Sequence, residues 1–236
     1  MKIQPSKIYG PKRKAESELD QGKIVAAALD LLDEDGFDGL TMRSLAKKLG
    51  IKAASLYWHL HGKQDLLSLL ADEICAPMRK PDRTLHWRKQ LEILGNEYRR
   101  ILLAHRDAAR VLSSSGAPSG PNRLRLTEIV LSILLDAGFA PQDAVYAGFL
   151  LNDYVTMFVS VETQSLNSVA ESVFEDSPSD VQNWLEALPV NEYPSVLALA
   201  DHLIKSDSDE RFQFGIEILQ NGLENHLANR SSKANN

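Results

Sequence analysis

Residues 41–60 bring together cationic, small and aromatic side chains in an order that suits contact with DNA. The stretch reads TMRSLAKKLGIKAASLYWHL, and its second half begins with small residues and ends in an aromatic run. Small residues let a helix approach the bases closely, and aromatic side chains with polar tips contact phosphates and thymine methyl groups. The pattern predicts a helix-turn-helix whose second helix enters the major groove.

The second helix of this motif must present side chains to DNA while it is held from behind. Ile51 and Leu56 supply the apolar anchor, and Gly50 supplies the positive φ that the turn needs. The outward or rim positions, which we expect to contact DNA, are Lys52, Ala53, Ser55, Tyr57, Trp58 and His59.

Helical periodicity surrounds the motif. From Leu19, apolar residues recur at three- and four-residue spacing, and Gly36 ends this first helix. Thr41 is expected to cap a short second helix and is itself a candidate DNA contact. A third helix is predicted over 52–59, and a fourth over 65–76.

The rest of the chain is also helical in pattern. The apolar period predicts helices over 84–104, 121–137, 141–164 and 206–228, and no segment shows the sustained two-residue alternation of a strand. Residues 162–210 contain 11 acidic residues against one lysine, which predicts a mobile loop with short helices. The expected fold class is therefore all-α.

Composition and proline positions divide the chain into three parts. Residues 1–18 are polar, and we expect a flexible basic arm there. Its cluster at 12–14 either reaches phosphates or a minor groove or belongs to a solvated tail. Residues 19–79 are then an N-terminal three-helix DNA-binding domain with a helix-turn-helix, and residues 80–230 form a C-terminal helical domain.

The net charge of −6 is distributed unevenly. Residues 1–64 carry 11 Lys and Arg against 8 Asp and Glu, whereas residues 65–236 carry 15 against 24. The basic excess lies beside the helix-turn-helix, and phosphate binding depends on that local field. The acidic total therefore does not exclude a nucleic-acid partner.

Other classes of protein find little support. The longest apolar stretches, such as VLSILL at 130–135, are far shorter than the roughly 20 residues of a membrane span, and the basic start is not followed by an apolar segment. Cys75 is the single cysteine, which suits the reducing cytoplasm, and its apolar neighbours favour an inert thiol. Metal-binding, phosphate-loop and nucleophile motifs are absent, so we expect neither a cofactor nor an enzyme.

The run IVAAALDLLDEDGFDGLTMRSLAKKLGIKAASLYWHLHGKQDLLSLLADEI resembles the N-terminal domain of TetR-family repressors, and its LYWH is similar to the tetracycline repressor branch. The resemblance spans residues 19–74. It implies that Arg43 reads a guanine and the adjacent backbone, that Lys63 binds phosphate, and that residues 57–59 contact the backbone and a thymine. Residues 52–54 depart from that repressor, so we expect a different operator.

The C-terminal part is similar, more weakly, to the ligand-binding and dimerisation domain of the same branch. The similar stretches are WRKQLEILGNEYRRILLAHRDAARV and DAGFAPQDAVYAGFLLNDYV. The resemblance implies a homodimer in which 141–164 and 206–228 form a four-helix interface with their counterparts. A dimer suits a palindromic double-stranded operator, because two recognition helices must meet successive major grooves about 34–36 Å apart.

The residues that bind magnesium and tetracycline in that branch are missing. Leu112 occupies the position of the metal-binding histidine, and Val161 that of the glutamate that reaches the metal through water, with Glu162 one step off. Val130 and Arg79 replace the glutamine and histidine that hold the drug. Without these hard ligands we expect no metal site and no tetracycline sensing.

A pocket with apolar and aromatic walls and few polar groups is what remains of the ligand site. By alignment with the branch, the residues expected to face it or to contribute are Trp87, Tyr98, Leu112, Val130, Phe149, Asn152, Met157 and Val161. Asn152 is the best candidate for an orienting hydrogen bond. His105, Arg106 and Arg110 are expected near the path from the pocket to the DNA-binding domain.

Two hypotheses for the C-terminal half follow from these patterns. In the first, the chain is a homodimeric repressor that an apolar or aromatic small molecule releases from its operator. In the second, the C-terminal half is a protein-interaction or activator module, for which the acidic residues 162–210 would be the contact. A cavity of several hundred Å³ favours the first hypothesis, and a solid core favours the second.

Overall fold

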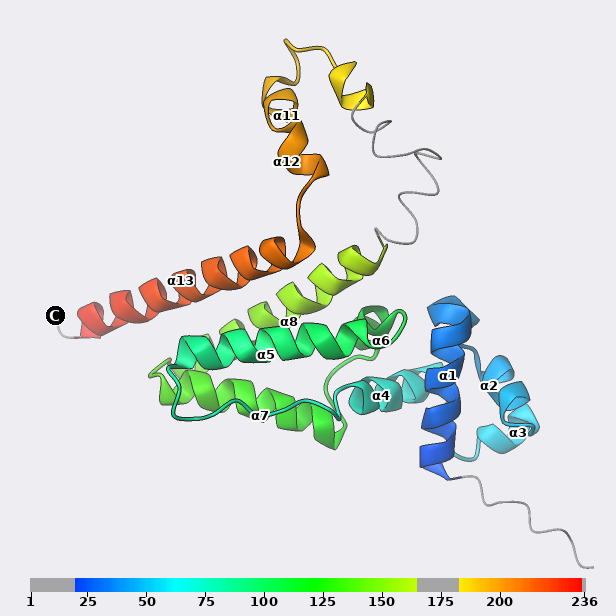
Figure 1. Cartoon of the computed structure of the whole chain (residues 1–236). Coiled ribbons are helices and arrows are strands. Elements are labelled where there is room, and N and C mark those ends of the chain that lie inside the picture. The colour runs from blue at the N-terminus through cyan, green and yellow to red at the C-terminus, as the bar shows by residue number, and fades with distance from the viewer. Residues whose placement is uncertain (1–19, 165–182, 235–236) are drawn as a thin grey trace, which may run out of the picture.

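The computed structural model describes residues 20–164 and 183–234, and these form helices without a strand (Figure 1). The all-α fold predicted from the periodicity is therefore confirmed. The helices are α1 (Gln21–Gly39), α2 (Met42–Lys48), α3 (Ala53–Leu56), α4 (Lys63–Ile74), α5 (Trp87–Leu103), α6 (Ala108–Ser114), α7 (Pro121–Asp136), α8 (Pro141–Gln164), α11 (Pro194–Ala198), α12 (Ala200–Ile204) and α13 (Ser208–Ala234). The expected arm at 1–18 lies outside the described residues, as does much of the acidic segment.

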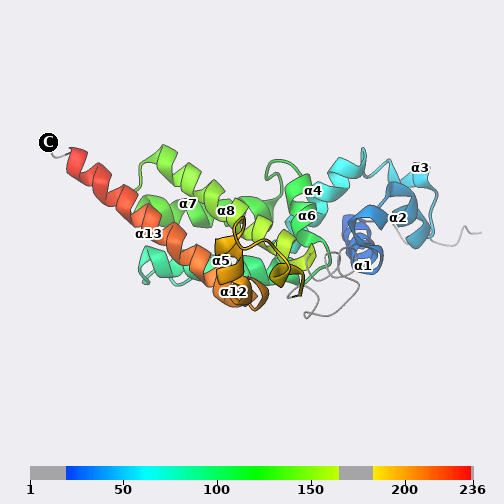
Figure 2. The ribbon, with the colours of Figure 1, turned by 90° about the horizontal axis from the view of Figure 1, so that it is seen from above.

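The molecule is elongated, with α1–α3 at one end and the C-terminal end of α13 at the other (Figure 2). Helix α4 leads from the small N-terminal group of helices into the larger body, where α5 and α7 pack against α8 (Figure 1). One continuous core of buried apolar side chains extends from α1 through α4 to α8 and α13. The larger group of helices and the N-terminal group with the helix-turn-helix therefore share one core.

Gly36 ends the regular part of α1, as the sequence predicts. Its φ of 72° and ψ of −176° are open essentially to glycine alone, and its carbonyl accepts the Leu40 N–H at 3.2 Å. The next residue, Phe37, donates its N–H to the carboxylate of Asp107 at 2.8 Å. A tight turn in the N-terminal domain is thus fastened to the C-terminal domain.

The helix-turn-helix forms where it was predicted, with one difference. Thr41 and Ser44 make a reciprocal capping box at the start of α2, and Gly50 has a φ of 68° in the turn. The second helix was expected to reach His59, but regular α-helix ends at Leu56 and the chain continues in tighter turns. These turns bring Leu60, which is buried, back into the core.

A short helix that the sequence pattern did not separate lies between α5 and α7. Helix α6 follows Asp107, which adopts a left-handed φ of 55° and so breaks the path from α5. Four of its seven residues are buried, because α6 packs on α4, α5 and α8. The predicted ranges 84–104, 121–137 and 141–164 otherwise match α5, α7 and α8 closely.

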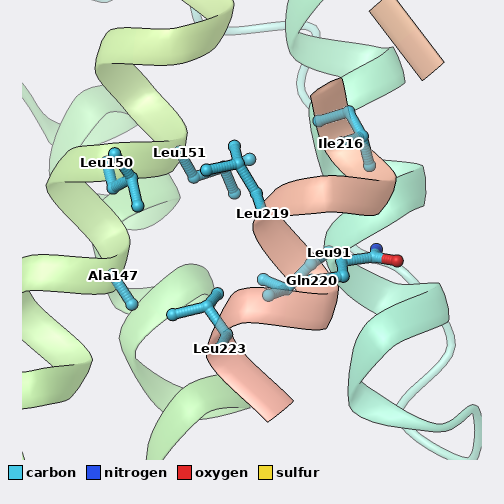
Figure 3. A pocket seen from close by; sticks show the side chains of 8 residues that line it. All are labelled: Leu91, Ala147, Leu150, Leu151, Ile216, Leu219, Gln220 and Leu223. Atoms are coloured by element: carbon cyan, nitrogen blue, oxygen red, sulfur yellow. The ribbon is translucent and has the colours of Figure 1, made fainter. Parts of the chain in front are cut away.

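Helix α13 packs across α5 and α8 through interleaved aliphatic side chains (Figure 3). Leucines of α8 and α13 face one another there, and the space left between them is about 10 Å³, no more than one water occupies. At one end of this contact Arg99 of α5 bonds to Glu162 of α8 and to Asp209 of α13, and lies over the ring of Phe212. Helices α8 and α13 are therefore held in a defined relative position.

Large apolar side chains remain exposed on both of these helices. On α8 and α13 they are Val145, Tyr146, Phe149, Leu150, Met157, Val161, Phe214 and Ile218. By length and composition alone, the span 141–163 of α8 is also apolar enough to cross a membrane, which the inspection of apolar stretches did not reveal. Polar residues within α8 hydrogen-bond to α5, as a helix of a folded helical body does.

We predict that Gly36→Ala destabilises the protein by about 1–3 kcal/mol, because alanine is strained at this φ and ψ. The added Cβ would also lie 2.9 Å from a carboxylate oxygen of Asp107. Thermal and urea unfolding followed by circular dichroism measure the effect. Gly62→Ser is the control, since Gly62 is extended, has open space for a Cβ and gains a favourable helix cap. Equal stability of the two variants would contradict the strain at Gly36.

Candidate functional site

The second helix of the helix-turn-helix is almost bare of packing contacts. Between residues 52 and 59 only Leu56 is buried, and it is wholly so. The predicted contact residues on either side of it are all exposed, and Trp58 reaches 88% exposure. The six residues in question are Lys52, Ala53, Ser55, Tyr57, Trp58 and His59.

An indole in water contributes little to the stability of the chain, so the exposure of Trp58 favours a contact role over a scaffold role. Tyr57 is half exposed, which likewise favours a contact role. Arg43 on α2 is exposed, and its neighbour Thr41 uses its side chain to cap that helix. Both belong to α2 or its cap, and α2 packs against the second helix.

The charge of this face is positive throughout. Residues 41–64 contain five Lys and Arg and no acidic residue. Two acidic residues of α1 are paired: Glu34 with Lys48 at 2.7 Å, and Asp38 with Arg110. Arg110 hydrogen-bonds to Asp38 and keeps the pKa of that carboxyl below its usual value. The face can therefore meet a polyanion without like-charge repulsion.

Lys63 occupies a different environment from the other predicted contacts. Its ammonium group lies 4.5 Å from the centre of the Phe37 ring and 3.4 Å from the Phe37 carbonyl oxygen. Arg110 covers the same ring at 4.3 Å. Lys63 thus lies at the junction of α1, α4 and α6, at the edge of the basic face.

A second site lies inside the C-terminal body. A cavity of about 1000 Å³ is bounded by α5, α6, α7 and α8 and by Cys75 and Met78, which follow α4, and most of its wall is apolar. Of the eight residues expected to face a ligand pocket, the structure brings together six: Tyr98, Leu112, Val130, Phe149, Asn152 and Met157.

The other two predicted residues lie outside this wall. Trp87 packs edge-on against Phe139, with ring centres 5.6 Å apart, so its indole belongs to the core at the far end of α5. Val161 lies on the exposed side of α8. It follows Met157 by four residues on the same face of the helix, one turn beyond the part of α8 where Met157 lines the cavity.

One group of polar side chains in the cavity comes from α5 and α8. The Tyr98 hydroxyl donates to Asn152 at 3.2 Å and lies 3.2 Å from the Thr156 hydroxyl. Burial raises the pKa of Tyr98, so the phenol stays protonated and able to donate. Burial also raises the pKa of Cys75 to about 12, so this cavity-lining thiol is not a nucleophile.

Thr156 was not among the predicted residues, although its spacing could have identified it. It follows Asn152 by four residues, so both lie on one face of α8. Arg123 and the loop residues 116–118 also line the cavity. Arg123 and residues 117–118 gave no signal in the sequence, because their position depends on how the loop before α7 folds back.

This loop is fastened to α4 from both sides. The amide of Gln64 donates to the Ser114 carbonyl at 3.1 Å, and the hydroxyl of Ser68 donates to the Ser115 carbonyl at 3.1 Å. On the other side the Asp72 carboxylate accepts the backbone N–H groups of Asn122 and Arg123, both at 2.9 Å. The cavity wall and α4 are therefore one hydrogen-bonded unit.

The three residues expected on the path to the N-terminal domain lie at its junction with α1. His105 contacts Asp33 at 3.0 Å, and Arg106 donates to the Glu34 carbonyl at 2.9 Å. Arg110 binds both carboxylate oxygens of Asp38. The end of α5 and the start of α6 thus grip the C-terminal turn of α1.

No cluster of three or more His, Cys, Asp and Glu side chains suited to a metal is found among residues 20–164 and 183–234. At the cavity, Leu112 and Val130 present aliphatic side chains where the tetracycline repressor branch has metal and drug ligands. The cavity is therefore suited to an apolar or aromatic molecule with a few oxygen atoms rather than to a metal chelate.

Comparison with known proteins gives matches at both ends of the chain. Residues 80–227 match the family described as "Tetracyclin repressor-like, C-terminal domain", and residues 24–70 match "Bacterial regulatory proteins, tetR family". The class A tetracycline repressor from transposon 1721 of Escherichia coli is 32% identical over 88% of this chain and 91% of its own length. An HTH-type transcriptional regulator of Saccharopolyspora erythraea is 42% identical over 61% of each chain.

Solved structures agree with these matches. Apo ActR from Streptomyces coelicolor superposes with a TM-score of 0.80 at 31% identity, covering 92% of this chain and 100% of that one. ActR in complex with actinorhodin gives a TM-score of 0.77 at 33% identity, covering 88% and 96%. These relatives are transcriptional regulators rather than enzymes. With family matches at both ends and relatives similar over most of its length, the chain belongs to the TetR family of DNA-binding transcriptional regulators.

Proposed function

We propose that this chain is a homodimeric cytoplasmic repressor, which an apolar or aromatic small molecule releases from a palindromic operator. The observation that carries the proposal is the cavity of about 1000 Å³ whose wall is hydrogen-bonded to α4. A cavity at the upper end of the usual size of ligand sites favours a sensor over a protein-interaction module, which needs no internal space. ActR, which shares the fold, has been solved with actinorhodin and with (S)-DNPA.

The exposed apolar side chains of α8 and α13 support the dimer. They lie on neighbouring helices whose relative position is fixed by the contacts of Arg99, and a second copy would cover them. Phe149 and Met157 line the cavity and are also exposed, so the cavity opens on this same face. Assembly and ligand binding would therefore share one side of α8.

Release of the operator would follow from the hydrogen bonds that join α4 to the cavity wall. A ligand that displaces the loop before α7 also displaces Ser114, Ser115 and the backbone of Arg123, to which α4 is bonded. Because α4 packs against α1, the two recognition faces of a dimer move with it. A spacing that no longer matches successive major grooves weakens binding to DNA.

The proposal as a whole is tested with the DNA that the full chain selects from a random duplex library. We expect a palindromic consensus, two chains bound per duplex, and release by at least one compound found in a thermal-shift screen of apolar and aromatic molecules. Electrophoretic mobility shift measures both binding and release. A single chain per duplex would contradict the proposed dimer. If none of the compounds that stabilise the protein changes its affinity for DNA, the proposed sensor function is contradicted.

We predict that Trp58→Ala lowers affinity for the selected DNA about tenfold or more while the melting temperature stays unchanged, because the indole contacts nothing in the core. Lys52→Ala should reduce the salt dependence of log Kd by about one unit of slope. Fluorescence anisotropy across a salt series measures both effects. Trp184→Ala is the matched control, since this indole is also exposed but lies far along the chain. A comparable loss in the control would contradict the assignment of the face.

We predict that Asp72→Ala uncouples ligand from DNA. It removes the acceptor for two backbone N–H groups of α7, at a cost of about 1 kcal/mol in stability. For any compound that releases the wild-type chain, the ratio of DNA Kd with and without compound should fall about fivefold or more.

Gly120→Ala should act in the same way, because its Cβ would overlap the Asp72 carboxyl group. Asp82→Ala is the control, since its carboxylate caps Thr84 in an exposed loop. An unchanged Kd ratio in both test variants would show that the signal does not pass through this contact.

A further inference from the structure

Arg123 is the cationic side chain in the wall of the cavity. Its guanidinium donates to the Gly116 carbonyl at 3.0 Å and, more weakly, to the Ala117 carbonyl at 3.5 Å. The side chain is only partly exposed, and none of the carboxylates in the described part of the chain forms an ion pair with it. The hydrogen bonds that this guanidinium makes within the described residues thus go to neutral carbonyl oxygens.

The charge of Arg123 acts on the interior of the cavity. It opposes the rise in pKa of both Cys75 and Tyr98, so its field reaches the two groups that line the inner wall. Two carboxylates lie nearby: Asp153 also lines the cavity and raises the pKa of Tyr98, and Asp72 raises the pKa of Cys75. Asp72 accepts N–H groups of α7, and Asp153, on the rim of α8, is exposed and accepts from Asn152.

A guanidinium in this position gains most from an anionic partner. A carboxylate or sulfonate adds the attraction of opposite charges to the hydrogen bond and accepts two parallel N–H groups of a guanidinium, which gives geometric specificity as well as energy. The field of a partly buried cation is also less screened than that of a surface one. The apolar remainder of the wall accepts only a molecule whose body is apolar.

We propose that the effector is an anionic aromatic molecule, whose carboxylate or sulfonate binds Arg123 while its ring system fills the apolar part of the cavity. A carbonyl or phenol oxygen of the same molecule would meet the Tyr98–Asn152 pair. The inference rests on the proposed sensor function and adds to it the charge of the ligand and the residue that recognises that charge.

Binding of an anion at Arg123 would also affect α4. An anion that attracts the guanidinium competes with the Gly116 and Ala117 carbonyls, so the loop loses its internal fastening. The backbone N–H of the same Arg123 is bonded to Asp72 of α4. One residue therefore joins the bound charge to the helix that carries the DNA-binding domain.

Two fluorescent probes that differ by one sulfonate test the inference. They are 8-anilinonaphthalene-1-sulfonate and N-phenyl-1-naphthylamine, which share the aromatic body. In titrations of the full chain, Arg123→Gln should weaken binding of the sulfonate about tenfold to a hundredfold, the range for loss of a charged hydrogen bond. The neutral probe should change less than about twofold, since it makes no such bond.

Three further variants separate the charge from other effects. Arg125→Gln is the matched control, because Arg125 lies two residues away on α7 but donates outside the cavity to the Ala76 carbonyl. Arg123→Lys should retain most of the preference for the sulfonate. Gly148→Phe fills the cavity and should abolish binding of both probes if they bind there. Circular dichroism and binding to the selected DNA establish that each variant is folded.

Each outcome decides the matter. A selective loss of the sulfonate in Arg123→Gln, with rescue by lysine, supports the anion site. Equal weakening of both probes, or equal loss in Arg125→Gln, overturns it while leaving a sensor for neutral molecules. If neither probe binds in the cavity the anion site is overturned, and failure of every screened compound to release DNA would overturn the sensor function separately.

Discussion

Helix α4 packs in two groups of helices at once, and the rest of the structure depends on this shared position. Its apolar face contacts α1 on one side and α6 and α7 on the other, and Leu66 and Leu70 within it are fully buried. Near the C-terminal end of α4, Asp72 caps α7, and Gly120 leaves the space that the Asp72 carboxyl group needs. Since protein interiors pack without slack, α4 cannot shift relative to one domain without disturbing the other.

In the helix-turn-helix, a few buried residues hold the second helix while its other side chains stay exposed. Leu56 and Leu60 are almost fully buried and anchor the segment, which leaves every other position of the second helix free. Trp58 in water is unfavourable for the isolated chain, in contrast to Trp87, which packs against Phe139 in the core. The two tryptophans illustrate how an exposed aromatic residue points to a surface made for binding.

Helix α8 combines the demands of a cavity wall with those of an outer surface. Asn152 and Thr156 lie four residues apart and share the hydroxyl of Tyr98, which places the polar part of the cavity on one stripe of the helix. Phe149 and Met157 border the cavity and remain exposed. The apolar composition of α8, which would suffice to cross a membrane, therefore has another explanation. One side of the helix lines the cavity, and the proposed dimer would cover its exposed side.

The sequence by itself determined the all-α fold, the positions of the long helices, the end of α1 at Gly36 and the helix-turn-helix with its turn at Gly50, because these depend on local periodicity and on backbone angles that glycine adopts. It also placed six of the eight expected pocket residues, since resemblance to a family carries over helix faces. It did not determine the end of α13, which was predicted at 228 and lies at Ala234. Only the tertiary structure decided that Asp72 caps α7 and that Arg123 lines the cavity. Both depend on a loop folding back onto a helix some fifty residues earlier in the chain, and no local pattern encodes that approach.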